Sequence, residues 1–213
     1  MPAVETASTG ERRLRHTVVA FDAFLPPAEV AKLYAETLAR EHEFIPSRTN
    51  DDNPDIRRSL VLDAPPALVA TVVARVRAVM PQVLAQIRLP MIDVGLMEAQ
   101  VTANNDGAYF GIHTDADYDK QKLRHLTYVY YYNGEPLGFE GGMLRVYDDV
   151  LRNNKLARSD SFQHVPPRHN TIVFFWARAM HEVEPVRVPS KLFRDSRFTV
   201  NGWINRKQEP TSQ

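Results

Sequence analysis

The hydrophobic period of this chain changes once, close to residue 90. Before that point, two segments at roughly 27–42 and 66–86 place their apolar residues on one face of a helix. After it, apolar residues recur in short runs that turn-forming residues such as Asn-Asp-Gly separate, at roughly 94–104, 108–114, 124–133, 142–147, 171–176, 181–187 and 196–204. This order predicts an α+β fold, mainly β: a double-stranded β-helix, or jelly-roll barrel, with N-terminal supporting helices on one outer face. A β-sandwich without a cavity is the alternative.

The chain of 213 residues is expected to form a single domain at 15–205, with helical support at 15–90 and the jelly-roll core at 91–205. Residues 1–14 and 206–213 are polar and lack a hydrophobic pattern, so we expect two flexible tails. Two polar segments inside the domain, 45–58 and 151–162, are candidate specificity elements that would form loops near a substrate.

Charge and composition exclude several classes of function. The 26 basic and 26 acidic side chains cancel, so the chain lacks the positive surplus that drives binding to nucleic acid or to an anionic membrane. The absence of cysteine leaves only His, Asp and Glu as metal ligands. The N-terminus lacks the apolar stretch of a signal peptide, and we expect no later stretch to approach a membrane span. We therefore expect a cytoplasmic protein without nucleic-acid or membrane partners, of open oligomeric state.

Three residues could form a metal site. His113 and Asp115 lie two positions apart in a predicted strand and therefore point to the same face, and His181 opens a later strand. A single His-x-Asp motif is weak evidence, because 7 His and 14 Asp residues in 213 positions give roughly half of one such motif by chance. Two His and one carboxylate on a β-barrel match the facial triad of non-haem Fe(II) oxygenases, although they also suit Zn(II). A keto acid at the open positions of such a site would need a buried Arg, and Arg197 begins an apolar strand.

The order of these motifs resembles the prolyl-4-hydroxylase-like Fe(II)/2-oxoglutarate-dependent oxygenases, most of all the hypoxia-inducible-factor-type prolyl hydroxylases. The resemblance covers roughly residues 95–205. It rests on His113-Thr114-Asp115, Arg124 to Asn133, Gly141-Gly142 with the residues up to Tyr147, Val173-Phe174-Phe175-Trp176, His181 to Val186, Arg197 and Trp203.

The resemblance implies a cupin-like barrel and a role for each of six residues. His113, Asp115 and His181 would bind Fe(II); Arg197 and Tyr131 would hold the distal carboxylate of 2-oxoglutarate, and Leu144 would line its pocket. No catalytic residue is expected beyond the metal ligands. Arg197 lies further from His181 than is usual in the family, so Lys191 and Arg194 are alternative partners of 2-oxoglutarate.

The implied reaction consumes O2 and 2-oxoglutarate, with ascorbate as a candidate stimulant, and hydroxylates an unactivated C–H bond with release of succinate and CO2. The expected substrate is a prolyl residue in a peptide, a free amino acid or a related small molecule. Desaturation or ring closure by the same site is an open alternative, and so is a noncatalytic jelly-roll module that binds a metal or a carboxylate. Arg57, Arg58 and Arg145 could contact a substrate carboxylate, but an exposed Arg is usually only solvated, so they are not included among the predicted site residues.

Overall fold

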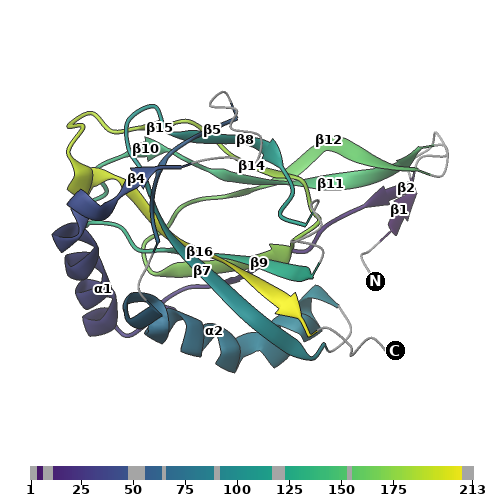
Figure 1. Cartoon of the computed structure of the whole chain (residues 1–213). Helices are drawn as coiled ribbons and strands as arrows, with labels where there is room; N and C mark the ends of the chain where they lie inside the picture. The colour runs from purple at the N-terminus through teal and green to yellow at the C-terminus, as the bar shows by residue number, and fades with distance from the viewer. Residues whose placement is uncertain are drawn as a thin grey trace, which may run out of the picture.

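Two antiparallel sheets pack face to face, and two helices cover the outer face of one of them (Figure 1). The computed structural model describes residues 4–6, 12–47, 56–63, 66–88, 92–116, 123–152 and 155–207. This arrangement confirms the predicted mainly-β jelly roll with supporting helices.

We call the helix-covered layer the helix-side sheet and the opposite layer the outer sheet. Each has seven strands among the described residues. The helix-side sheet has the order β3 (Val19–Phe21), β13 (Thr171–Trp176), β9 (Arg124–Tyr131), β16 (Arg197–Arg206), β7 (Val94–Asn104), β6 (Leu60–Leu62) and β4 (Ile45–Pro46). The outer sheet has the order β1 (Val4–Thr6), β2 (Arg12–Leu14), β11 (Leu144–Arg152), β14 (His181–Val183), β8 (Tyr109–His113) and β5 (Arg57–Arg58), with β12 (Lys155–Val165) also paired to β11. A small third sheet joins β10 (Glu140–Gly141) to β15 (Val186–Arg187).

The two faces of the helix-side sheet carry different side chains, because successive residues of a strand point to opposite sides. In β9, Tyr128 and Tyr130 are fully buried in the core beneath the helices, whereas Val129 and Tyr131 belong to the cluster between the sheets. Of the four tyrosines between positions 128 and 132, three therefore lie in the core beneath the helices, and Tyr131 lies on the inner face between the sheets.

The helices form close to their predicted bounds, as α1 (Pro27–Ala39) and α2 (Pro66–Ile87). Pro27 opens α1 where its missing N–H costs no hydrogen bond. In α2, residues spaced three or four apart, among them Val72, Val76 and Val83, are buried in the core shared with the helix-side sheet.

The expectation that no stretch approaches a membrane span is wrong for Ala67–Ile87, which is long and apolar enough to cross a membrane by length and composition. The same test is passed by core helices of folded domains. Here one face of the helix packs on the helix-side sheet, and this packing accounts for its apolar residues.

Other predictions need correction. The N-terminal segment 1–14 is not simply a tail, because β1 pairs with β2 and β2 pairs with β11 in the outer sheet. The segment 151–162 is not a loop: its described residues belong to β11 and β12, which pair through a backbone hydrogen-bond ladder although most residues of β12 are polar. The region 15–90 also supplies strands β3 to β6. Most of the predicted loop 45–58, and residues 208–213, lie outside the described residues.

Candidate active site

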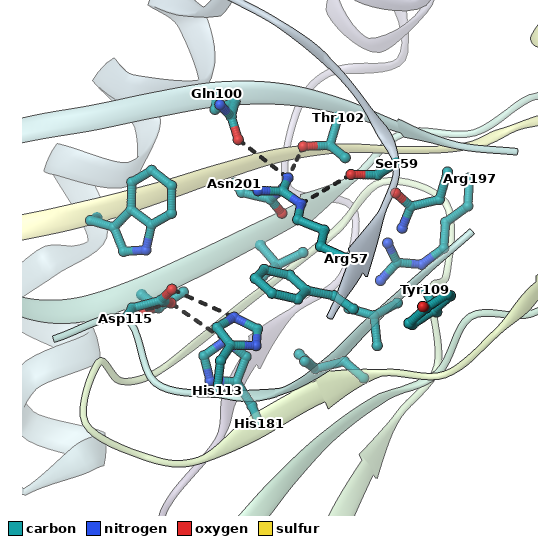
Figure 2. A pocket seen from close by; sticks show the side chains of 17 residues that line it. Arg57, Ser59, Gln100, Thr102, Tyr109, His113, Asp115, His181, Arg197 and Asn201 are labelled. Carbon is teal, nitrogen blue, oxygen red and sulfur yellow. Dashed lines mark hydrogen bonds and ion pairs between the residues drawn. The ribbon is translucent and has the colours of Figure 1, made fainter. Parts of the chain in front are cut away.

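Two histidines of the outer sheet face each other across neighbouring strands. His113 ends β8, His181 begins β14, and the two residues are cross-strand partners. Directly opposed residues point to the same face of a sheet, and the ring centroids lie 4.1 Å apart. Asp115 follows the end of β8 and turns its carboxylate toward both rings (Figure 2). One ligand atom from each residue lies within 4.8 Å of the others.

Backbone carbonyls set the tautomers of both histidines. Nδ1 of His113 lies 2.8 Å from the carbonyl oxygen of Gly111, and Nδ1 of His181 lies 2.9 Å from that of Ala179. A carbonyl only accepts hydrogen bonds, so each Nδ1 carries the proton and each Nε2 keeps a free lone pair. Both Nε2 atoms face Asp115, at 3.7 Å from Oδ1 and 3.4 Å from Oδ2. The sheet thus presents two nitrogen donors and one carboxylate on the same side of the pocket.

The carboxylate of Asp115 is buried and oriented by a neighbour on β9. Thr127 donates a hydrogen bond of 2.6 Å from Oγ1 to Oδ2 of Asp115. Burial by itself would raise the pKa of Asp115, but His181, His113 and the bond from Thr127 together hold it below its usual value. Burial, with His181 as the next cause, lowers the pKa of His113 to about 3. At neutral pH the site therefore holds an ionised carboxylate beside a neutral His113, the protonation states that bind a metal.

Arg197 lines the same pocket, and the ring of Tyr131 lies beside it. Arg197 is 2% exposed, and its guanidinium lies 5.0 Å from the centroid of the Tyr131 ring. Nε of Arg197 and the hydroxyl of Tyr131 have no hydrogen-bond partner among the described residues, nor do Oδ1 of Asn104 and Oγ1 of Thr199. Leu144, also fully buried, lines this pocket together with Arg197 and the triad. Buried polar groups without partners are rare, so these atoms indicate a space built for a polar ligand.

Lys191 and Arg194, the alternatives to Arg197, lie outside this pocket. The side chain of Arg194 is 67% exposed in a 3₁₀ turn at Phe193–Asp195, and Lys191 is exposed just before it. The segment between His181 and Arg197 contains this turn, which packs Phe193 on Phe198. The additional residues between His181 and Arg197 therefore form this turn and the segment around it, before β16 begins at Arg197.

Sequence analysis missed several lining residues that the period of two could have found. Tyr131 points into the barrel, so Val129 and Thr127 of the same strand do so as well. In β16, Asn201 and Trp203 lie an even number of residues after Arg197, so their side chains point to the same side of the strand and also line the pocket. Arg57, which was not included among the predicted site residues because an Arg is usually solvated, also lines the pocket. So do Ser59, Gln100, Thr102, Asn104, Tyr109, Phe110 and Val183.

Residues 99–205, half of the chain, match the 2OG-Fe(II) oxygenase superfamily. The chain belongs to this superfamily. This oxygenase is 42% identical over 186 residues to an uncharacterized PKHD-type hydroxylase of Synechocystis sp., a match that covers 86% of this chain and 61% of the relative. The chain thus spans 61% of the length of the curated relative it matches.

Solved structures share the fold of the oxygenase. A Pseudomonas putida prolyl-4-hydroxylase aligns with a TM-score of 0.67 at 22% identity, covering 91% of this chain and 94% of the other. A Trichoplax adhaerens prolyl hydroxylase, solved with a hypoxia-inducible-factor peptide, gives a TM-score of 0.62 at 17% identity, covering 89% and 83%. The viral collagen prolyl hydroxylase of Paramecium bursaria Chlorella virus-1, solved with 2-oxoglutarate, gives 0.60 at 19% identity, covering 89% and 96%.

The residues of the pocket fit the two groups that the superfamily uses. Two imidazole nitrogens and one carboxylate are the donor set of non-haem Fe(II) oxygenases, whose facial arrangement leaves coordination positions open. Nε of Arg197 and the hydroxyl of Tyr131, which have no hydrogen-bond partner among the described residues, suit a carboxylate. This member of the 2OG-Fe(II) oxygenase superfamily therefore carries the His-x-Asp…His triad, and the family implies Fe(II) as the metal and 2-oxoglutarate as the co-substrate.

Proposed function

We propose that this oxygenase hydroxylates an unactivated C–H bond and that six residues hold its metal and co-substrate. His113, Asp115 and His181 bind Fe(II). Arg197 pairs with the distal carboxylate of 2-oxoglutarate, Tyr131 donates a hydrogen bond to it, and Leu144 packs against its carbon chain. The observation that carries the proposal is one pocket lined both by the donor atoms of the triad and by a buried Arg197 whose Nε has no hydrogen-bond partner among the described residues.

The protein's part in this reaction is to bind, orient and exclude water. Bound Fe(II) supplies the activation of O2, which oxidises the substrate C–H bond to C–OH while 2-oxoglutarate becomes succinate and CO2. The Gly111 and Ala179 carbonyls keep the Nε2 atoms of both histidines free to bind the metal. Thr127 holds one oxygen of Asp115 in place. Apolar walls from Val129, Leu144 and Val183 keep the pocket dry.

The proposed substrate is a prolyl residue, an amino acid or a related small molecule. The printed names of the relatives, a PKHD-type hydroxylase and several prolyl hydroxylases, support hydroxylation as the outcome and a peptide as one source of the substrate. The equal numbers of acidic and basic residues support the further proposal of an enzyme without a nucleic-acid substrate. A cytoplasmic location is proposed as well.

An anaerobic optical titration tests the assignment. Fe(II) followed by 2-oxoglutarate should produce the visible charge-transfer band of a chelated keto acid in the wild-type protein and in His164→Ala, which removes a half-exposed histidine outside the pocket. The band should be absent in His113→Ala. Succinate release under O2 then shows turnover. Binding without succinate, with every candidate substrate, would favour the noncatalytic module, and the absence of any band would refute the metal and co-substrate assignment.

A further inference from the structure

A second arginine lies in the pocket near the triad. Arg57, on β5, lines the same cavity as His113 and Asp115, and its guanidinium lies over the ring of Phe110, 4.8 Å from the centroid (Figure 2). That ring in turn stacks on His113, with the centroids 3.5 Å apart. Arg57 is therefore separated from a metal ligand by a single aromatic ring.

The guanidinium of Arg57 is only partly satisfied by the protein. Its Nε donates to Oγ of Ser59 at 3.0 Å, and Nη2 makes a long contact of 3.4 Å to Oε1 of Gln100. Its remaining N–H groups have no partner among the described residues, and within that part of the chain no carboxylate forms an ion pair with Arg57. Burial lowers the pKa of Arg57 to about 10, against the opposing effect of Asp115, so the group is still a cation at neutral pH.

Among the described residues that line the pocket, no negative charge is left over to balance that cation once the metal and co-substrate are bound. The charged residues among its described lining are Arg57, Asp115 and Arg197. Once Fe(II) and 2-oxoglutarate are bound, the metal and Arg197 together balance Asp115 and the two carboxylates of the co-substrate. The positive charge of Arg57 remains, in a partly buried position where an unpaired charge is unfavourable.

We infer that Arg57 binds a carboxylate of the primary substrate, so that this enzyme oxidises a carbon of an acid that carries a free carboxylate rather than an internal residue of a peptide. The inference rests on the proposed function and deepens it. A planar guanidinium with free N–H groups matches a carboxylate with two hydrogen bonds, and the Phe110 ring lies beside the guanidinium, 4.8 Å from its central carbon. Arg57 then acts as a specificity-determining residue beside the metal.

The test uses two probes of the same size that differ in charge, cyclopentanecarboxylate and cyclopentanecarboxamide. The protein is loaded anaerobically with Fe(II) and saturating 2-oxoglutarate, and each probe is titrated while the visible band is followed. In the wild type we expect the acid to shift the band and to bind at least tenfold more tightly than the amide. Arg57→Gln should lose this preference, Arg57→Lys should keep part of it, and both variants should bind 2-oxoglutarate within threefold of wild type.

The matched control is Arg58→Gln, which removes the same charge from the next residue of β5, whose side chain is exposed. This variant should keep the full preference for the acid. Thermal melting of all variants checks that the fold is intact.

Four results would overturn the inference while leaving the proposed function standing, because the band itself reports the proposed function. These are equal binding of acid and amide, no binding of either, loss of the band as the acid displaces 2-oxoglutarate, and loss of 2-oxoglutarate affinity in Arg57→Gln. A second pair, N-acetyl-L-proline and its N-methylamide, separates a free carboxylate from a peptide bond. Tighter binding of the methylamide would point to an internal peptide residue and would also overturn the inference.

Discussion

At the scale of single residues, the geometry of Asp115 depends on Thr127. The hydroxyl of Thr127 donates a hydrogen bond to Oδ2 of Asp115, while Oδ1 of Asp115 faces His113. Residues that orient metal ligands commonly contribute 10- to 100-fold to metal affinity. Thr127→Val removes the hydroxyl with little change in volume, and we expect Fe(II) affinity to fall by about that factor. A competition titration with a metal chelator measures it.

Thr171 provides the control for Thr127. It is also buried and also donates to a carboxylate, Oδ1 of Asp22 at 2.8 Å, but it does not line the pocket. Thr171→Val should lower the free energy of unfolding by about 1 kcal/mol and leave Fe(II) affinity unchanged. Equal loss of iron affinity in both variants would show that Thr127 has no specific role at Asp115.

Arg197 is the residue on which the proposed orientation of 2-oxoglutarate depends. Arg197→Gln keeps polar atoms at this position but removes the charge, and breaking such a buried charged pairing costs about 2–4 kcal/mol. We expect the dissociation constant of 2-oxoglutarate to rise by roughly 30- to 1,000-fold, with Fe(II) binding retained. The optical titration measures both. Arg194→Gln should match the wild type because that side chain is exposed, and a larger effect there would reassign the partner of the co-substrate.

At the scale of elements, the loop between β10 and β11 positions Arg197. Gly142 has φ of +65°, and a Cβ there would lie 2.7 Å from Cδ of Arg197 and 2.9 Å from Cγ2 of Val186. A side chain at this position would therefore push Arg197 away from its place at the start of β16. The second glycine of the pair thus has a direct structural reason, since it lets the backbone pass closely over the arginine.

Gly142→Ala is therefore expected to weaken 2-oxoglutarate binding on the order of tenfold or more, because the displaced guanidinium no longer meets the carboxylate. Gly107→Ala is the control: its φ is +74°, so it suffers comparable backbone strain, but its nearest neighbour would be the exposed Arg58. Both variants should lose about 1 kcal/mol of stability, and only Gly142→Ala should change the optical titration. The same change in both would attribute the effect to backbone strain alone.

At the scale of the whole molecule, the triad couples stability to pH when no metal is bound. An unfolded histidine has a pKa near 6.5, whereas that of His113 in the fold is lowered to about 3. Between these values the unfolded chain binds a proton that the folded chain does not, so stability falls as the pH decreases from about 6.5 toward 3, by up to about 1.4 kcal/mol per pH unit. The lowered pKa of Asp115 acts in the same direction at lower pH.

Urea denaturation of the metal-free protein between pH 7 and pH 4.5 measures this dependence. His113→Gln should show a flatter profile than the wild type, because it removes the group that takes up the proton. His42→Gln is the control, since the side chain of His42 is 79% exposed, and its profile should follow the wild type. Parallel profiles for the wild type and His113→Gln would show that other groups dominate the acid sensitivity.

The sequence by itself determined the elements and much of the chemistry of this protein. The spacing of the hydrophobic residues and the turn-forming residues were sufficient to predict both helices and most core strands. The strands β7 and β13 have the predicted bounds. The same patterns found only the first part of β11 and missed β12 and β2, because these two strands carry mainly polar, partly exposed residues without a clear hydrophobic alternation. The three-residue strand β1 was missed as well. The motif order also placed His113, Asp115 and His181 in one candidate site before any geometry was known.

Only the tertiary structure decided which residues share the pocket. Arg197 and Arg194 differ little as sequence, but strand pairing buries the first and leaves the second in solvent. Arg57 comes from a short strand distant in sequence from the triad, and its pairing with β8 brings it to the metal site. Such contacts depend on which strands are neighbours in a sheet, a long-range property that local hydrophobic patterns do not encode.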